Sequence, residues 1–186
     1  KVIGIDDLSY GLLEQVPSQV NFYKISILDN NIYPLFNNVD IVFHLAAKNC
    51  ISDCQLDTVE TVKINVLGTV KVFEACKRSD VKTVIYAESS AVYEGTSTFP
   101  SREEDESPES VYANSKMASR LFANTYHTFS NINTIALRYF NVYGPRQDYR
   151  RSIPPLICEI IIKLLKKEKP IIFGDGQKKR DFIYID

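Results

Sequence analysis

Residues 82–89, KTVIYAES, predict a strand near the middle of the 186-residue chain. β-Branched and aromatic residues favour extended backbone, and they make up the centre of this run. The polar segment 94–110 follows and contains two prolines, which predicts a loop. The chain therefore leaves a strand for a surface loop within a few residues of Ser89.

Helical and strand patterns alternate on both sides of this strand. A helix is predicted over about residues 57–78, where apolar residues recur at steps of three and four: Val59, Val62, Val66, Val70 and Phe73. A second is predicted over about 111–130, with four residues packing inward: Leu121, Phe122, Tyr126 and Phe129. Further strands are predicted at 1–6, 20–27, 39–47, 133–140, 170–173 and 181–185, and a further helix at about 154–167. This alternation predicts an α/β fold, in which a doubly wound, mostly parallel sheet is covered on both faces.

Composition excludes several classes of protein. The chain is 45% hydrophobic and 24% charged, with a net charge of -1, as in an ordinary globular domain. That balance argues against a nucleic-acid or polybasic membrane partner. No apolar run reaches the roughly 18 residues of a spanning helix, and no signal-peptide pattern is present. The cysteines fit no zinc spacing, so we expect no metal and a cytoplasmic protein with reduced thiols: Cys50, Cys54, Cys76 and Cys158.

The segment VYANSK (111–116) places Tyr112 and Lys116 four positions apart. On a helix such residues share a face, roughly 5–6 Å apart at their Cβ atoms. An ammonium there lowers the pKa of a phenol from about 10, which suits a general acid or base. The same pair also fits a simple surface contact. Ser89 ends the strand that precedes this helix, where it is either a third member of a proton-handling group or a turn residue.

Two other strand ends carry candidate ligand-binding residues. Ligands of parallel α/β sheets bind beyond the carboxyl ends of the strands. Asp6 ends the first strand, where a carboxylate can accept hydrogen bonds from an adenosine ribose or can cap a loop. HLAA (44–47) ends another strand, and its small residues let a flat ligand approach the backbone.

Seven short blocks occur in order along the chain: DDLSYG, VFHLAA, NVLGT, ESSAVY, YANSK, LRYFNVYGPRQ and GDGQKKRDFIYID. With these blocks the chain resembles the extended short-chain dehydrogenase/reductase family, in the branch of NAD-dependent nucleotide-sugar epimerases and dehydratases. The resemblance implies a Rossmann-like fold, NAD as cofactor and a nucleotide-sugar substrate. It also implies a homodimer in which the helices at 57–78 and 111–130 pair across a two-fold axis.

The resemblance assigns roles to residues of this chain. It makes Tyr112 the catalytic base, Lys116 its cationic neighbour, and Ser89 the hydroxyl beside the substrate. The implied cofactor-binding residues are Asp6, Asp7, Leu45, Ala46, Ala47, Asn65, Tyr112 and Lys116. The implied substrate-binding residues are Ser89, Asn141 and Arg180. Taken alone, Asn65 also fits a buried polar helix residue, and Arg180 a solvated member of the basic run KKRD.

The chain departs from the family pattern in its glycines. The seven glycines form no GxxGxxG motif, whose backbone amides hold a pyrophosphate at a helix N-terminus. We therefore expect a fragment that lacks the first β-α unit and the C-terminal part. Within it, residues 1–145 are expected to form an incomplete NAD-binding domain, and residues 146–186 the start of a substrate-binding region.

The residues after Ser89 favour one reaction of the family. A 4,6-dehydratase of this type looks to need an Asp-Glu pair there, but Ser90 and Ala91 follow Ser89. We therefore expect a UDP-hexose or UDP-N-acetylhexosamine 4-epimerase that passes through a 4-keto sugar. A dehydratase, a decarboxylase of nucleotide-sugar acids, and a non-catalytic NAD-binding or NAD-sensing protein remain as alternatives.

Overall fold

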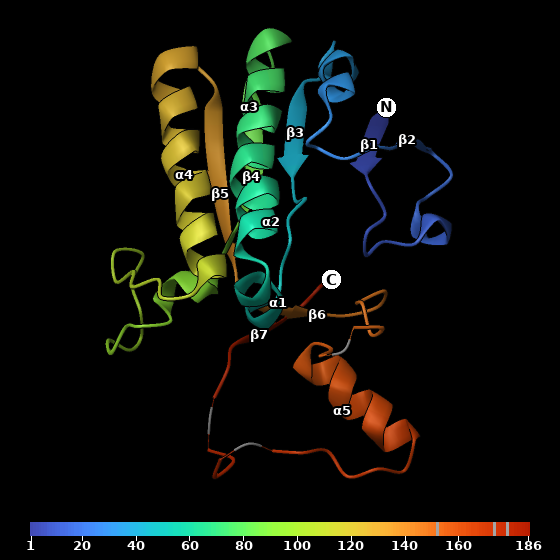
Figure 1. Ribbon diagram of the computed structural model, residues 1–186, viewed down its shortest axis with the longest axis vertical. Coiled ribbons are helices and arrows are strands. Elements are labelled where there is room, and N and C mark those ends of the chain that lie inside the picture. The colour runs from blue at the N-terminus through green and yellow to red at the C-terminus, as the bar shows by residue number, and fades with distance from the viewer. Residues whose placement is uncertain (152, 173, 178) are drawn as a thin grey trace. The chain divides into compact units, whose positions relative to one another are not determined.

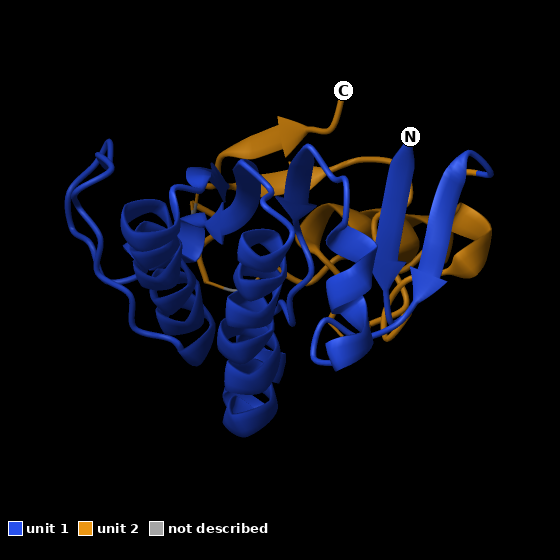
Figure 2. Ribbon diagram, turned by 90° about the horizontal axis from the view of Figure 1, so that it is seen from above, with its two compact units in different colours: residues 1–7, 18–139 blue, residues 8–17, 140–186 orange. Residues whose placement is uncertain are grey.

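The structure is a computed structural model that describes residues 1–151, 153–172, 174–177 and 179–186. Its backbone divides into two compact units, coloured separately in Figure 2. The first unit comprises residues 1–7 and 18–139, and the second comprises residues 8–17 and 140–186.

Five strands of the first unit form two parallel sheets (Figure 1). Strands β3 (Ile41–His44), β4 (Thr83–Ser89) and β5 (Asn133–Tyr139) pair in the order β3-β4-β5. Strands β1 (Val2–Asp6) and β2 (Val20–Lys24) form a separate parallel pair. Parallel neighbours need a crossover connection, and helices supply it before and after β4. The α/β class is therefore confirmed.

The crossover between β3 and β4 is interrupted, although the sequence predicts one helix over most of it. It consists of α1 (Ile51–Leu56), α2 (Thr58–Val62), the π-helical turn η3 (Lys63–Gly68) and α3 (Thr69–Arg78). The crossover between β4 and β5 is α4 (Val111–Ser130), with the predicted bounds. Three short 3₁₀ segments also occur: η1 (Leu13–Gln15), η2 (Asn30–Phe36) and η4 (Ser90–Tyr93).

Side-chain hydrogen bonds fix the start of α4. The Ser110 hydroxyl caps the helix by accepting a hydrogen bond from the Ala113 amide at 3.1 Å. The Glu94 carboxylate in turn accepts a hydrogen bond from the Ser110 amide at 2.8 Å. The helix ends at Asn131, which has the left-handed conformation typical of a C-terminal cap.

The core of the first unit lies between the β3-β4-β5 sheet and the helices α3 and α4. Phe73 is fully buried, with its ring stacked on Tyr126 at 5.2 Å and edge-on to Tyr86 at 6.1 Å. Val84 and Tyr86 project from β4 at the two-residue period of a strand. Ala123 leaves room for these rings on the buried face of α4.

The prediction that four apolar residues of α4 pack inward is wrong for three of them. Leu121 is 62% exposed and Phe129 is 83% exposed, and Phe122 is also exposed, whereas Tyr126 packs against the core. The reason is helical geometry, because Ala123 and Tyr126 lie on the face that meets the sheet and the other three do not.

The sheet is also less covered than expected. In Figure 1, α3 and α4 lie in front of β4 and β5, and β3 lies beside α3. Apolar side chains on the edge strands nevertheless remain exposed: Ile41, Phe43, Ile135 and Leu137. Among the described residues, α3 and α4 pack against one face of this three-stranded sheet, and these four side chains lie on its other face.

The second unit contains β6 (Asn141–Tyr143) paired in parallel with β7 (Phe182–Tyr184), and α5 (Leu156–Leu165). The predicted strand at 170–173 does not form over residues 170–172, and Phe173 lies outside the described residues. Ile171 and Ile172 are exposed there and pair with no strand among the described residues. Across the described parts of both units, no helix is both long enough and apolar enough to span a membrane.

Candidate active site

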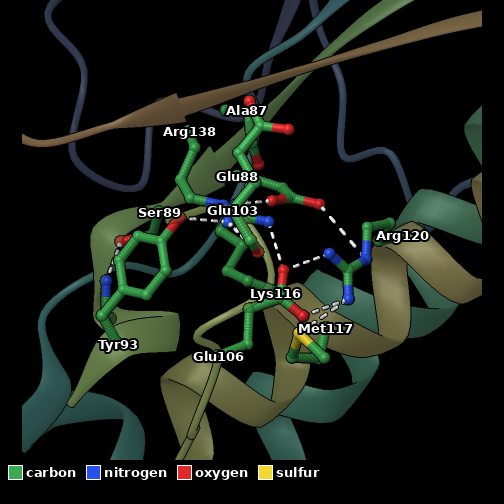
Figure 3. Close-up of polar contacts among 11 residues, drawn as sticks. Ala87, Glu88, Ser89, Tyr93, Glu103, Glu106, Lys116, Met117, Arg120 and Arg138 are labelled. Atoms are coloured by element: carbon green, nitrogen blue, oxygen red, sulfur yellow. Dashed lines mark hydrogen bonds and ion pairs between the residues drawn. The ribbon is translucent and has the colours of Figure 1, made fainter. Parts of the chain in front are cut away.

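Ser89, Tyr112 and Lys116 come together at the end of β4 and the start of α4. Ser89 is the last residue of the strand, and its side chain hydrogen-bonds the Tyr112 hydroxyl. Lys116 Nζ lies 5.9 Å from the centroid of the Tyr112 ring, one helical turn away. It donates a hydrogen bond to the Ala87 carbonyl at 3.1 Å (Figure 3). The structure thus brings the three predicted side chains together, with Lys116 buried and Ser89 and Tyr112 half-buried.

The pKa of Tyr112 is raised above its usual value of about 10, mainly because the phenol is buried. The hydrogen bond from Ser89 offsets part of this effect. The expectation that Lys116 lowers this pKa is wrong for the chain by itself. The ammonium is directed to the Ala87 carbonyl, and the loss of solvation of the phenolate dominates.

Lys116 is itself affected by burial. Its pKa is lowered to about 8, because an ammonium loses hydration in this position. The negative charge of Glu88 opposes that shift. At neutral pH Lys116 is therefore still mostly charged, although its pKa is only slightly higher than the pH, and the neighbouring phenol of Tyr112 is protonated.

His44, at the end of β3, is neutral and buried. Its Nε2 lies 2.9 Å from Thr69 Oγ1, and the Thr69 hydroxyl donates to the Asn65 carbonyl at 2.6 Å. Because the single hydroxyl proton is used there, His44 Nε2 carries the hydrogen of the bond to Thr69. Burial, and then the charge of Lys116, lowers the pKa of His44 to about 3.

Asn65 joins two segments next to the site. Its Oδ1 accepts a hydrogen bond from the Lys48 amide at 2.7 Å, and its Nδ2 donates to the Lys48 carbonyl at 2.9 Å. Nδ2 also donates to Ser115 Oγ at 2.9 Å, on the same turn of α4 as Tyr112 and Lys116. Asn65 lies in the π-helical turn η3 and is buried, so it holds the segment after β3 against α4.

The remaining predicted substrate residues lie in the second unit. Asn141 begins β6, and its Nδ2 donates to the Asp181 carbonyl at 2.9 Å. Arg180 is exposed, and its Nη1 donates to the Lys179 carbonyl at 2.8 Å. These contacts are local to the second unit.

A buried group of charges beside the site was not predicted from the sequence. Glu88, between Ala87 and Ser89, is buried and pairs with Arg138 and Arg120, as Figure 3 shows. The sequence nevertheless contains a pattern from which this group of charges could have been predicted. Glu88 continues the two-residue period of Val84 and Tyr86, so the pattern puts an acid on the buried face of a strand, where a carboxylate requires cationic partners.

Comparison with known proteins agrees with this geometry. The model of the NAD dependent epimerase/dehydratase family matches residues 1–186. The UDP-glucose 4-epimerase of Mycolicibacterium smegmatis is 31% identical over 100% of this chain and 62% of its own length. Dehydratases and decarboxylases are among the other relatives.

The solved structures that are similar to this chain include nucleotide-sugar 4-epimerases. UDP-N-acetylglucosamine 4-epimerase from Methanobrevibacter ruminantium, in complex with UDP-N-acetylmuramic acid, is 35% identical with a TM-score of 0.95, over 99% of this chain and 61% of that one. UDP-glucuronic acid 4-epimerase from Bacillus cereus, in complex with UDP-glucuronic acid and NAD, is 30% identical with a TM-score of 0.86. That match covers 99% of this chain and 61% of the other. The fold and the site define a Rossmann-like protein of the short-chain dehydrogenase/reductase type. The chain belongs to the NAD dependent epimerase/dehydratase family, and it spans about 61% of these relatives.

The residues at the strand ends of the first unit fit part of a dinucleotide. Asp6 ends β1 with an exposed carboxylate, and Asp7 follows it. The predicted segment from Leu45 to Ala47 follows β3, and the side chains of Ala46 and Ala47 are small enough to let a ring approach the backbone. The first unit therefore contains carboxylates that can accept hydrogen bonds from ribose hydroxyls, and small side chains beside the backbone after β3. The 186 residues contain no glycine-rich pyrophosphate turn.

Proposed function

We propose that the protein containing this chain is an NAD-dependent 4-epimerase of a nucleotide-linked sugar, with a UDP-hexose or UDP-N-acetylhexosamine as substrate. The observation that carries the proposal is the group of Ser89, Tyr112 and Lys116 at the end of β4. A hydroxyl, a phenol and an ammonium in this arrangement can remove a proton from a sugar hydroxyl and return it. The printed names of the relatives support the choice of substrate class.

Each side chain has a distinct task in this reaction. Tyr112 accepts the proton of the sugar hydroxyl as that carbon is oxidised, and Ser89 donates a hydrogen bond to the oxygen that becomes a ketone. Lys116 stabilises the phenolate, but the raised pKa of Tyr112 shows that its charge is not sufficient alone. NAD, when bound, supplies the acceptor for the electrons of the sugar carbon and a second positive charge. Asp6 and Asp7 would hold its adenosine ribose.

Ser90 and Ala91 favour an epimerase over a dehydratase. They directly follow Ser89 at the start of η4, and Ser89 Oγ accepts a hydrogen bond from the Ala91 amide at 3.2 Å. Neither side chain is an acid that could deliver or remove the protons required for elimination of water. With NAD as the electron acceptor and donor, these side chains would suit reversible oxidation of one sugar carbon, which epimerisation at C4 requires.

The test is a panel of nucleotide sugars incubated with a polypeptide that carries this chain together with the flanking segments that its relatives have. NMR should show that a UDP-sugar and its 4-epimer reach one equilibrium from either side, without net consumption of NAD. A 4-keto-6-deoxy product would identify a dehydratase instead, and release of carbon dioxide a decarboxylase. Binding of NAD with no turnover of any sugar would identify a binding or sensing protein.

We further propose that the protein is a homodimer through the helical residues 57–78 and helix α4. Val59 of α2 and Leu67 of η3 are exposed there, and the adjoining Leu56, the last residue of α1, is 87% exposed. Leu121 and Phe129 form a second exposed apolar set on α4. Isologous pairing across a two-fold axis is the commonest soluble assembly and would bury both sets.

A further inference from the structure

Four charged side chains form one network beside the candidate site (Figure 3). Glu88 Oε2 accepts a hydrogen bond from Arg138 Nε at 2.9 Å, and Glu88 Oε1 lies 3.8 Å from Arg120 Nε. Glu106 pairs with both arginines. The members come from β4, β5, α4 and the loop at 94–110, so the network connects four segments that are far apart in the sequence.

The network is attached to the site through the backbone of β4. The neighbours of Glu88 are Ala87, whose carbonyl accepts from Lys116 Nζ, and Ser89, whose side chain hydrogen-bonds Tyr112. Successive strand residues point to opposite faces, so the carboxylate of Glu88 can hold the strand from one side while its neighbours face the other way.

The two arginines fix that strand to its surroundings in two directions. Arg138 is the register partner of Glu88 on β5, so their ion pair also secures the alignment of β4 with β5. Arg120 lies one turn beyond Lys116 on α4, which places it on the same face of that helix. Arg120 therefore connects the strand to the helix next to the Lys116 contact, while Arg138 connects β4 to β5.

We propose that Glu88 is the positioning residue of this site. Through Arg138 and Arg120 it holds Ser89 and the Ala87 carbonyl at their distances from Tyr112 and Lys116, an inference that rests on the proposed function. Glu106, which pairs with the same arginines, lies on the loop at 94–110 instead, where its neighbours Asp105 and Ser107 hydrogen-bond Arg102 and the backbone of Val92 and Gly95. The position of Glu88 in the chain therefore gives it a role that Glu106 lacks.

Turnover of the NAD-loaded longer polypeptide tests this role. E88Q keeps the shape of the side chain and should lower kcat about 10-fold to 100-fold, because misplacement by about 1 Å can cost that much, while KM for the nucleotide sugar stays within about 3-fold. Since Glu88 acts partly through Ser89, the loss in E88Q/S89A should be smaller than the product of the two single losses. E74Q is the matched control, because Glu74 also pairs with two cations, Arg78 at 3.1 Å and Lys77 at 3.9 Å, but on α3.

Three results would decide against the proposal. These are an E88Q turnover equal to wild type, losses in E88Q and S89A that multiply in the double variant, and an equal loss in E74Q. If circular dichroism shows that E88Q does not fold, R120Q replaces it. R120Q keeps the Arg138–Glu88 pair and should give a smaller loss of the same kind, and wild-type turnover would overturn the proposal.

A second readout does not depend on the reaction, so it separates failure of this inference from failure of the proposed function. In the tyrosine-labelled chain, the Cζ resonance of Tyr112 reports its hydrogen bond to Ser89 at neutral pH. E88Q and S89A should move that resonance in the same direction, while E74Q leaves it unchanged. A shift in S89A with none in E88Q would overturn the positioning role, whether or not the longer polypeptide is an epimerase.

Discussion

Replacement of His44 by glutamine should make the chain more resistant to acid. His44 is buried and neutral, and its pKa is lowered to about 3 from an ordinary value of 6.5. Between these values the unfolded state binds more protons than the folded state, so stability falls as the pH falls from 6.5 toward 3. At about 1.36 kcal/mol per pH unit, acidification from pH 6.5 to pH 4 costs the wild-type chain on the order of 3 kcal/mol through this residue alone.

The variant removes that cost but keeps the local hydrogen bond. The glutamine Nε2 can donate to Thr69 Oγ1, as His44 Nε2 does, and it does not titrate. Urea unfolding followed by circular dichroism at pH 7 and pH 4 should show a smaller loss for H44Q than for wild type. H127Q is the matched control and should lose as much as wild type, because His44 remains. Equal losses in H44Q and wild type would refute the reasoning.

Three further predictions concern catalysis, the core and assembly. In the NAD-loaded longer polypeptide, Y112F should lower kcat about 10²-fold to 10⁴-fold and retain the affinity for the nucleotide sugar. Y126F, remote from the site, should leave kcat unchanged. Wild-type turnover in Y112F would exclude Tyr112 as the base. F73A should lower the free energy of unfolding by about 3–5 kcal/mol, measured in urea, because Phe73 is fully buried against two rings, and a loss below about 1 kcal/mol would contradict that packing. Light scattering should show a dimer for the longer polypeptide and a monomer for the double variant L121E/F129E; a wild-type monomer at micromolar concentration would count against the proposed interface.

Much of the fold was predictable from periodic patterns. Strand β4 and helix α4 appear within one residue of their predicted bounds, because both have strong local signals, namely a β-branched run and a capped amphipathic segment. The π-helical turn η3 was not predicted, because the apolar period continues through it, and the hydrogen bonds of its Asn65 to the Lys48 backbone join residues 17 positions apart. The inward packing of Phe129 was mispredicted, because an apolar residue does not itself show which face of a helix meets the core.

The sequence by itself determined the α/β alternation and brought Tyr112 and Lys116 onto one helical face, since both follow from spacings of a few residues. Only the tertiary structure decided the chemical state of that pair. Burial raises the pKa of Tyr112, and the Lys116 ammonium is bound to the Ala87 carbonyl, 29 positions away. Desolvation and long-range contacts depend on what the folded chain places around a side chain, and spacing along the sequence does not contain that information.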